Sequence, residues 1–212
     1  RRVRQRHEHF LAALLALGAG RHPDLTDNDQ RGPKYLNTPE TVLFHKGAQL
    51  HGAIPELLQR GTVPVLVLAC GRVLEQSLDI MHWALRQNDP DGLLPDDADE
   101  QSRTDALIAQ NDGDFKQALD RYKYPGRYGL SDGNPCRAQA TAILMEWDVH
   151  LKKNAYIINS RPGLADYALL PFVRQFAGTD DAYFIGLDAP ALQRWLAALT
   201  GSALFAQVML KA

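Results

Sequence analysis

Residues 61–94 read GTVPVLVLACGRVLEQSLDIMHWALRQNDPDGLL and carry the clearest order of structural signals in the chain. The apolar run at 63–68 is typical of a buried strand. Pro64 marks an edge, a strand start or a cis bond, because proline cannot donate to a sheet ladder. A three-residue turn leads into a second strand at 72–74, which predicts a hairpin. Ser77 then stands at the position of a helix N-cap, ahead of apolar residues at helical spacing.

A dense group of turn formers, NDPDG, follows this stretch and separates two periodic segments. We therefore expect a linker at 88–96. From residue 97 onward the apolar spacing is helical. The sequence predicts an α+β chain of two domains, with an α/β domain over 1–87 and an all-helical bundle over 97–212. The helices are expected at 105–122, from 134 to about 152, at 161–176, at 189–199 and at 202–209.

The first sixty residues carry the weakest signals. The segment 7–17 suits a helix, and 41–45 suits a short strand. The basic start and the following apolar run imitate a secretory signal, but a surface amphipathic helix is the interpretation we favour. His7 and His9 would point apart on a helix and have no third ligand at useful spacing, so no metal site is expected.

Composition narrows the classes of partner. The formal net charge of −2 supplies no basic field for nucleic acid or for an anionic membrane. Cys70 and Cys136 are the two cysteines, and their separation favours neither a disulfide framework nor a zinc site. No apolar run approaches the roughly 20 residues that cross a bilayer. We expect a cytoplasmic protein without a metal, nucleic-acid or membrane partner.

Three stretches together resemble the glutathione S-transferase superfamily. SLDIMHWALRQNDPDG, NDGDFKQALDRYKY and LADYALLPFVRQFAG occur in the order and at the spacing of a bacterial subgroup of that family. The resemblance covers about residues 61–210. It implies a thioredoxin-like N-terminal domain, divergent or incomplete over 1–60, followed by the helical bundle. It also implies a homodimer.

The resemblance assigns a glutathione clamp to four residues. In this family a cis Val-Pro bond presents the Val backbone to the cysteinyl part of glutathione, and an acid-Ser or Gln-Ser pair holds its γ-glutamyl end. The matching residues are Val63, Pro64, Gln76 and Ser77. A helix N-terminus suits a ligand carboxylate because of its free N–H groups and positive dipole end. The structural alternative is that Ser77 only caps its helix and Pro64 only shapes its strand.

A second-substrate cleft is implied at the end of the helix over 105–122, between the two domains. Its candidates are Tyr122, Lys123 and Tyr124, with Arg127 close by; the alternative is an ordinary aromatic surface at a helix end. The acids beside the clamp are Glu75 and Asp79, and the alternative for both is a solvated face. In the family an acid just after the clamp often reaches the γ-glutamyl amine of the ligand bound by the partner subunit, a role that the sequence does not assign to one of them.

The residue that should activate the sulfur is missing from the expected place. No strand-like run precedes the segment 7–17, and no Cys precedes Cys70. Three interpretations stay open: a divergent first half, a lost first strand, or residues 1–60 that are not the native reading. The implied function is therefore conjugation of glutathione to a small electrophile, or thiol–disulfide exchange. The alternative is a glutathione-transferase-fold protein that binds but has lost catalysis.

The motif RPGLAD at 161–166 resembles the P-S-L-A-D motif of the family's helical domain. There a Ser or Thr caps the helix that runs through the domain core, and the Asp completes a capping box. Gly163 replaces that Ser, at a cost of a few tenths of a kcal/mol. Asp166 is predicted to be structural and not catalytic. Cys136, at a helix start, has a position that could lower its pKa but lies far from the clamp in sequence.

Overall fold

The computed structural model describes residues 37–38, 41–44, 65–68, 70 and 72–209. These residues fall into two compact units. One spans Gly92–Ala206, and the other holds the described residues up to Asp91 together with those from Gln207 onward. The predicted linker at 88–96 contains the position at which one unit ends and the next begins, and the domain limits themselves stay predictions. The helix predicted at 7–17, with its His7 and His9, lies outside the described residues.

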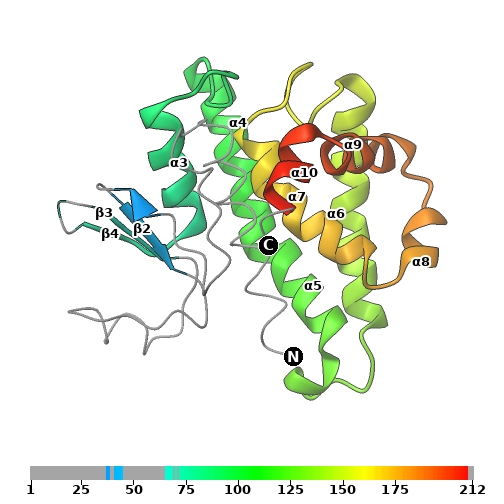
Figure 1. The fold of residues 1–212 in the computed structure, drawn as a ribbon. Helices are drawn as coiled ribbons and strands as arrows, with labels where there is room; N and C mark the ends of the chain where they lie inside the picture. The colour runs from blue at the N-terminus through cyan, green and yellow to red at the C-terminus, as the bar shows by residue number, and fades with distance from the viewer. Residues whose placement is uncertain (1–36, 39–40, 45–64, 69, 71, 210–212) are drawn as a thin grey trace. The chain divides into compact units, whose positions relative to one another are not determined.

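The described strands of the first unit form one antiparallel sheet in the order β1-β2-β3-β4 (Figure 1). The β3–β4 hairpin predicted from the sequence is confirmed, and β2 agrees with the short strand expected at 41–45 to within one residue. Leu66 on β3 pairs with Leu74 on β4, and both side chains are buried. The strands are β1 (Asn37–Thr38), β2 (Thr41–Phe44), β3 (Val65–Leu68) and β4 (Val73–Leu74).

Helices make up most of the rest of the described chain. The first unit contributes α3 (Ser77–Gln87), which follows β4 directly. The second unit is helical, as predicted. Its helices are α4 (Ala98–Gln110), the π-helical turn η2 (Asn111–Phe115), α5 (Lys116–Lys123), the 3-10 turn η3 (Pro125–Tyr128), α6 (Asn134–Lys153), α7 (Leu164–Ala177), α8 (Asp181–Ile185) and α9 (Pro190–Thr200). The last helix, α10 (Ala203–Met209), begins in this unit and extends beyond its end at Ala206.

The core of the helical unit forms around α7. Every residue of this helix except Arg174 is buried. A helix that is apolar on all sides lies inside a bundle, because no face of it favours water. Rings from three other helices pack together at its C-terminal half: the Phe115 and Trp147 centroids lie 5.0 Å apart, and those of Tyr122 and Phe176 lie 5.6 Å apart. The helix at 161–176 therefore runs through the core, as the resemblance implied.

The helix predicted at 105–122 needs two corrections. It begins earlier, at Ala98, because Asp97 caps it by accepting a hydrogen bond from the Glu100 N–H at 2.8 Å. It is also interrupted by the π-helical turn around Gly113, where one extra residue is accommodated before Phe115 turns back into the core. The short elements η3 and α8 were not predicted, since each is too short to show a period. None of the helices in the described part of the chain has the length and hydrophobicity needed to cross a bilayer.

Candidate functional site

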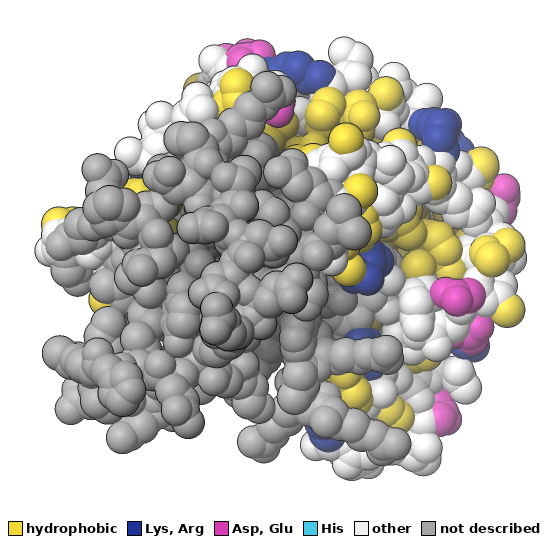
Figure 2. Space-filling model, viewed as in Figure 1, with side chains coloured by type: hydrophobic (Ala, Val, Ile, Leu, Met, Phe, Trp, Pro, Cys, Tyr) yellow, Lys and Arg dark blue, Asp and Glu magenta, His cyan; other side chains and the backbone are white. Residues whose placement is uncertain are grey.

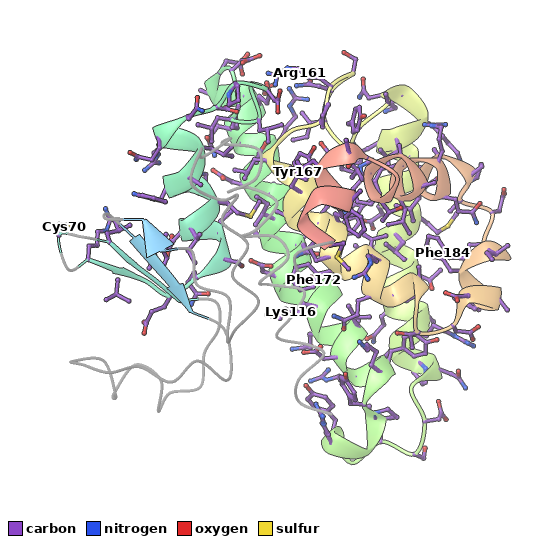
Figure 3. The ribbon with its side chains drawn as sticks, viewed as in Figure 1. Cys70, Lys116, Arg161, Tyr167, Phe172 and Phe184 are labelled. Carbon is purple, nitrogen blue, oxygen red and sulfur yellow. The ribbon has the colours of Figure 1, made fainter. Side chains whose placement is uncertain are left out.

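The β3–β4 hairpin lies between the two predicted parts of the clamp in the sequence. Val67 pairs with Val73, and the Leu68 N–H donates to the Arg72 carbonyl at 2.9 Å, which closes the turn. Cys70 lies exposed at this turn (Figure 3). Because the strands are antiparallel, the start of β3 and the end of β4 lie together at the opposite end of the hairpin.

The start of α3 carries the described half of the predicted clamp. Gln76 is exposed, has an extended backbone and occupies the N-cap position, and its side chain makes no hydrogen bond to the first turn. Ser77 is the first helical residue, so the prediction that Ser77 is the N-cap was wrong by one position. The Ile80 N–H donates to the Gln76 carbonyl at 3.1 Å and begins the helical ladder. Val63 and Pro64 lie outside the described residues, and their role stays a prediction.

The two acids next to the clamp differ in their surroundings. Asp79 lies in the first turn of α3 and is exposed. Glu75 is half-buried, and its Oε1 is buried without a hydrogen-bond partner within the described part of the chain. A buried carboxylate oxygen without a donor is unfavourable by a few kcal/mol. Of the two acids, Glu75 is therefore the one with a buried carboxylate oxygen that still needs a hydrogen-bond donor.

The predicted second-substrate residues form a cation–aromatic cluster at the end of α5. The Arg127 guanidinium lies 4.0 Å from the centroid of the Tyr124 ring, and the Lys123 ammonium lies 5.4 Å from it. Tyr122 turns the other way and packs on Phe176 in the core. The three consecutive side chains therefore do not share one surface, and whether any of them contacts a substrate stays a prediction.

Tyr122 belongs to a packed group with α6 and α8. The Arg137 guanidinium lies 4.0 Å from the Tyr183 ring centroid and 5.8 Å from that of Tyr122, and it forms an ion pair with Asp180 at 3.4 Å. Burial raises the pKa of the Tyr122 hydroxyl, which a hydrogen bond to Arg137 partly offsets. The hydroxyl is therefore protonated at neutral pH and suits a hydrogen-bond donor better than a base.

Asp166 is a buried acid of the helical unit whose two carboxylate oxygens both accept hydrogen bonds. Its Oδ1 accepts hydrogen bonds from the Ile157 N–H at 2.9 Å and from the Trp195 indole N–H at 2.6 Å. Its Oδ2 accepts from the Gly163 N–H at 2.9 Å. Burial raises the pKa of Asp166 to about 6, although these hydrogen bonds act in the opposite direction. All of these donors belong to the fold, which agrees with the predicted structural role of Asp166.

A surface groove in the helical unit was not predicted. It has a cavity volume of about 630 Å³ and is lined by Arg103, Ala106, Leu107, Gln110, Glu146, His150, Lys153, Asn154, Ile157 and Ile158. On α4 and on α6 the lining residues recur three, four and seven positions apart, so each stripe was visible in the sequence. What the sequence did not show is that these two stripes face each other. Tyr122, Lys123 and Tyr124 do not line this groove.

The charges and cysteines of the described residues provide no competing site. Figure 2 shows Lys and Arg side chains scattered over the visible face of the helical unit, without one large basic patch. Cys136 is buried at the start of α6. Within the ranges that the structure describes, no three His, Cys, Asp or Glu side chains come together in a way that could hold a metal ion.

Comparisons with known proteins agree with this architecture. A family model described as the C-terminal domain of glutathione S-transferase matches residues 105–198. No curated protein sequence matches the chain. Among solved structures, glutathione S-transferase III in its apo form is 17% identical, has a TM-score of 0.67, and is matched over 96% of this chain and 91% of its own.

Two further similar structures contain ligands. Glutathione S-transferase I bound with lactoylglutathione has a TM-score of 0.61 at 22% identity, over 74% of this chain and 80% of its own. A glutathione transferase family member from Pseudomonas fluorescens pf-5, with two glutathione bound, has a TM-score of 0.61 at 22% identity, over 73% and 74% of the two chains.

These findings define a two-domain α+β protein in which a thioredoxin-like domain precedes an all-helical domain. Residues 105–198 match the family model of the glutathione S-transferase C-terminal domain, and the chain has the fold of solved glutathione S-transferases. The resemblance and the fold class predicted from the sequence are thereby confirmed.

Proposed function

We propose that this protein binds glutathione and conjugates it to a small electrophile or uses it in thiol–disulfide exchange. The observation that carries the proposal is the start of α3. Gln76 is exposed there and makes no side-chain hydrogen bond to the first turn of the helix. A helix start of this kind can accept the γ-glutamyl carboxylate of glutathione through its N–H groups and its dipole.

The proposed clamp consists of Val63, Pro64, Gln76 and Ser77. Pro64 is bonded directly to Val65, the first residue of β3, and Gln76 follows the last residue of β4 by two positions. The two parts of the proposed clamp therefore adjoin the two strands of one hairpin in the sequence. The similar structures that contain glutathione or lactoylglutathione support this ligand.

Glu75 extends the clamp. The γ-glutamyl group of glutathione carries an ammonium on the same carbon as its carboxylate, so a ligand carboxylate at Gln76 brings a donor close by. The buried Oε1 of Glu75 lacks a donor among the described residues, whereas Asp79 is exposed. We therefore assign the ammonium to Glu75 in preference to Asp79.

Either reaction requires a group that lowers the pKa of the glutathione thiol from about 8.5. The sequence before β3 lacks the Cys-Pro, Ser or Tyr motif at a strand–helix junction that supplies this group in the family. This observation favours the second candidate function, a binding protein of the same fold without catalysis.

Binding and turnover separate the two candidates. The chain should be retained on immobilised glutathione and should then be assayed with an aryl halide and with a mixed disulfide of glutathione. Turnover of either substrate supports the enzyme. Retention without turnover supports the binding protein, and the absence of retention overturns the clamp and both candidates.

A cytoplasmic homodimer with glutathione and a small electrophile or disulfide as its partners completes the proposal. One chain has a mass of 23.6 kDa, so light scattering distinguishes one chain from two without ambiguity. A monomer at micromolar concentration would remove the homodimer from the proposal and leave the clamp untouched.

A further inference from the structure

The turn that joins α5 to α6 carries two stacked pairs of arginine and tyrosine. The Arg121 guanidinium lies 5.7 Å from the centroid of the Tyr128 ring, and the Arg127 guanidinium lies 4.0 Å from that of Tyr124. Figure 1 shows this turn at one end of the helical unit, where α5 ends and α6 begins. The two pairs are neighbours, because Arg127 and Tyr128 are consecutive residues. We call these four residues, together with Leu130, the turn surface.

The backbone of the turn is held in one conformation. The Leu130 N–H donates to the Pro125 carbonyl at 3.1 Å. Gly129 ends η3 in the left-handed region, with a φ of 66°, which favours glycine. Beyond it, the chain passes so close to α5 that a Cβ at Gly133 would lie 2.5 Å from the Tyr122 carbonyl oxygen. The turn is therefore formed before a partner arrives, which lowers the entropic cost of binding.

Stacking determines which part of each arginine remains for a partner. A tyrosine ring covers a face of the guanidinium, whereas the N–H groups lie along its edge in a planar fork. This fork matches the two oxygens of a carboxylate. Arg127 is exposed, and Arg121 is only partly covered. Each arginine is therefore oriented by a ring while its edge can donate to an external acceptor.

Positive charge exceeds negative charge around the turn surface. The Asp120 carboxylate lies near Lys123 and Arg127 and offsets one positive charge. Asp132 accepts a hydrogen bond from the Asn134 N–H at 2.8 Å. Between residues 116 and 134 the chain has four cations, Lys116, Arg121, Lys123 and Arg127, and two acids, Asp120 and Asp132. An anionic partner is therefore favoured.

The neighbours of the two arginines indicate a protein partner. Tyr128 and Leu130 expose 48% and 38% of their surface, so apolar area lies beside the cations. Tyrosine and arginine are also enriched among the residues that dominate protein–protein affinity. A nucleic-acid strand suits this surface less well, because it needs free aromatic faces along a basic groove. Here each ring already carries a guanidinium, and the formal net charge of the chain is −2.

We propose that the turn surface binds an acidic segment of another protein. Carboxylates of that segment pair with the edges of Arg121 and Arg127, and an apolar side chain packs on Tyr128 and Leu130. The whole surface belongs to the unit Gly92–Ala206. The proposal therefore holds whether or not the protein is an enzyme.

Fluorescence anisotropy of the full chain with a labelled peptide tests the proposal. The peptide consists of Glu with Leu at every third position, and its binding should weaken as the salt concentration rises. Its matched control has Lys in place of each Glu and should not bind. Equal binding of the two peptides, or no binding of either, overturns the proposal. Tighter binding of an oligothymidylate of equal charge would overturn the choice of a protein partner.

Removal of both guanidinium groups tests the assigned residues. The double variant Arg121→Gln/Arg127→Gln should raise the Kd about tenfold or more, through loss of hydrogen bonds to charged groups. Arg86→Gln/Arg103→Gln is the matched control, because it removes the same charge from exposed helical positions outside the turn surface. Its Kd should equal that of the wild type, and thermal unfolding checks that both variants fold. Equal weakening in the two variants would show that net charge alone attracts the peptide.

A conservative variant tests the planar edge separately from the charge. Arg121→Lys/Arg127→Lys keeps both charges but replaces each fork by a point charge. It should raise the Kd about threefold to fivefold, less than the glutamine variant does. If the lysine variant bound the peptide as tightly as the wild type, the guanidinium edges would have no role and the proposal would be wrong.

Discussion

The starts of α3 and α7 satisfy their first N–H groups in opposite ways. At α7, the Asp166 carboxylate accepts from the Gly163 N–H, and Asp166 itself is buried. At α3, the N-cap residue Gln76 is exposed, and its side chain makes no hydrogen bond to the first turn of the helix. A helix start closed by its own carboxylate has a structural role, whereas one without such a carboxylate suits an external anion. The comparison predicts that one helix start controls stability and the other controls affinity.

Removal of the Asp166 carboxylate should have the largest effect. Asp166→Ala leaves buried donors from Ile157, Gly163 and Trp195 without their acceptor. The free energy of unfolding should fall by about 3–5 kcal/mol in urea titrations near pH 5. Asp114→Ala, at an exposed position of η2, is the control and should change it by less than about 0.5 kcal/mol. Equal effects of the two variants would remove the structural role of Asp166.

The pH dependence of stability isolates the same group. Folding raises the pKa of Asp166 from 3.8 to about 6, so the folded state favours the protonated carboxyl. This contribution is fully present below about pH 3.8 and is lost as the pH rises through about 6. Between these values, wild-type stability should fall relative to that of Asp166→Asn, by at most about 1.4 kcal/mol per pH unit.

The comparison of wild type with Asp166→Asn controls for the titration of the other acids. Burial also raises the pKa of Asp120, but Asp120 titrates in both proteins and cancels in the difference. Urea midpoints measured at half-unit steps of pH provide the curve. Parallel curves for wild type and Asp166→Asn would show that Asp166 does not titrate in this window.

At α3 the expected effect is on affinity. Gln76→Ala and Ser77→Ala should each raise the Kd for glutathione about tenfold, the effect of one hydrogen bond to a charged group. The urea midpoint should change little for Gln76→Ala, because Gln76 is exposed and makes no cap hydrogen bond. Calorimetry measures the affinity, and Ser102→Ala on the exposed face of α4 is the control. If Gln76→Ala and Ser77→Ala lowered the stability strongly but left the affinity for glutathione unchanged, the start of α3 would have a structural role like that of α7.

The smallest expected effect is at the N-cap of α7. A Cβ at Gly163 would lie 3.6 Å from the Leu93 carbonyl oxygen and 3.9 Å from Asp166 Oδ2, so a serine side chain has room. Gly163→Ser should stabilise the protein by a few tenths of a kcal/mol, since Ser exceeds Gly as an N-cap by about that amount. Thermal unfolding measures the change. If Gly163→Ser were less stable than the wild type, the Asp166 carboxylate would already occupy the space, and accept from the N–H groups, that the serine hydroxyl needs.

Local patterns in the sequence predicted most of the elements but few of the contacts. The β3–β4 hairpin, α6, α7 and α9 follow from apolar spacing and from turn residues, which act over a few positions. The π-helical turn Asn111–Phe115 was missed because it adds one residue within a continuous helix, and the apolar period on each side hides it. For the candidate site, Gln76 and Ser77 were found through the resemblance, and the N-cap position was assigned one residue too late.

The sequence by itself determined the order of the predicted strands and helices, the resemblance to glutathione S-transferases, and the capping role of Asp166. Each of these depends on neighbouring residues or on a recognisable motif. The tertiary structure alone decided which of those residues share surroundings. It packs Tyr122 on Phe176, whereas Tyr124 contacts Arg127. It also lets the Trp195 indole donate a hydrogen bond to Asp166, and it places the stripes of α4 and α6 on two sides of one groove. The physical reason is that helical spacing specifies which face a residue occupies, whereas packing between helices specifies what that face meets.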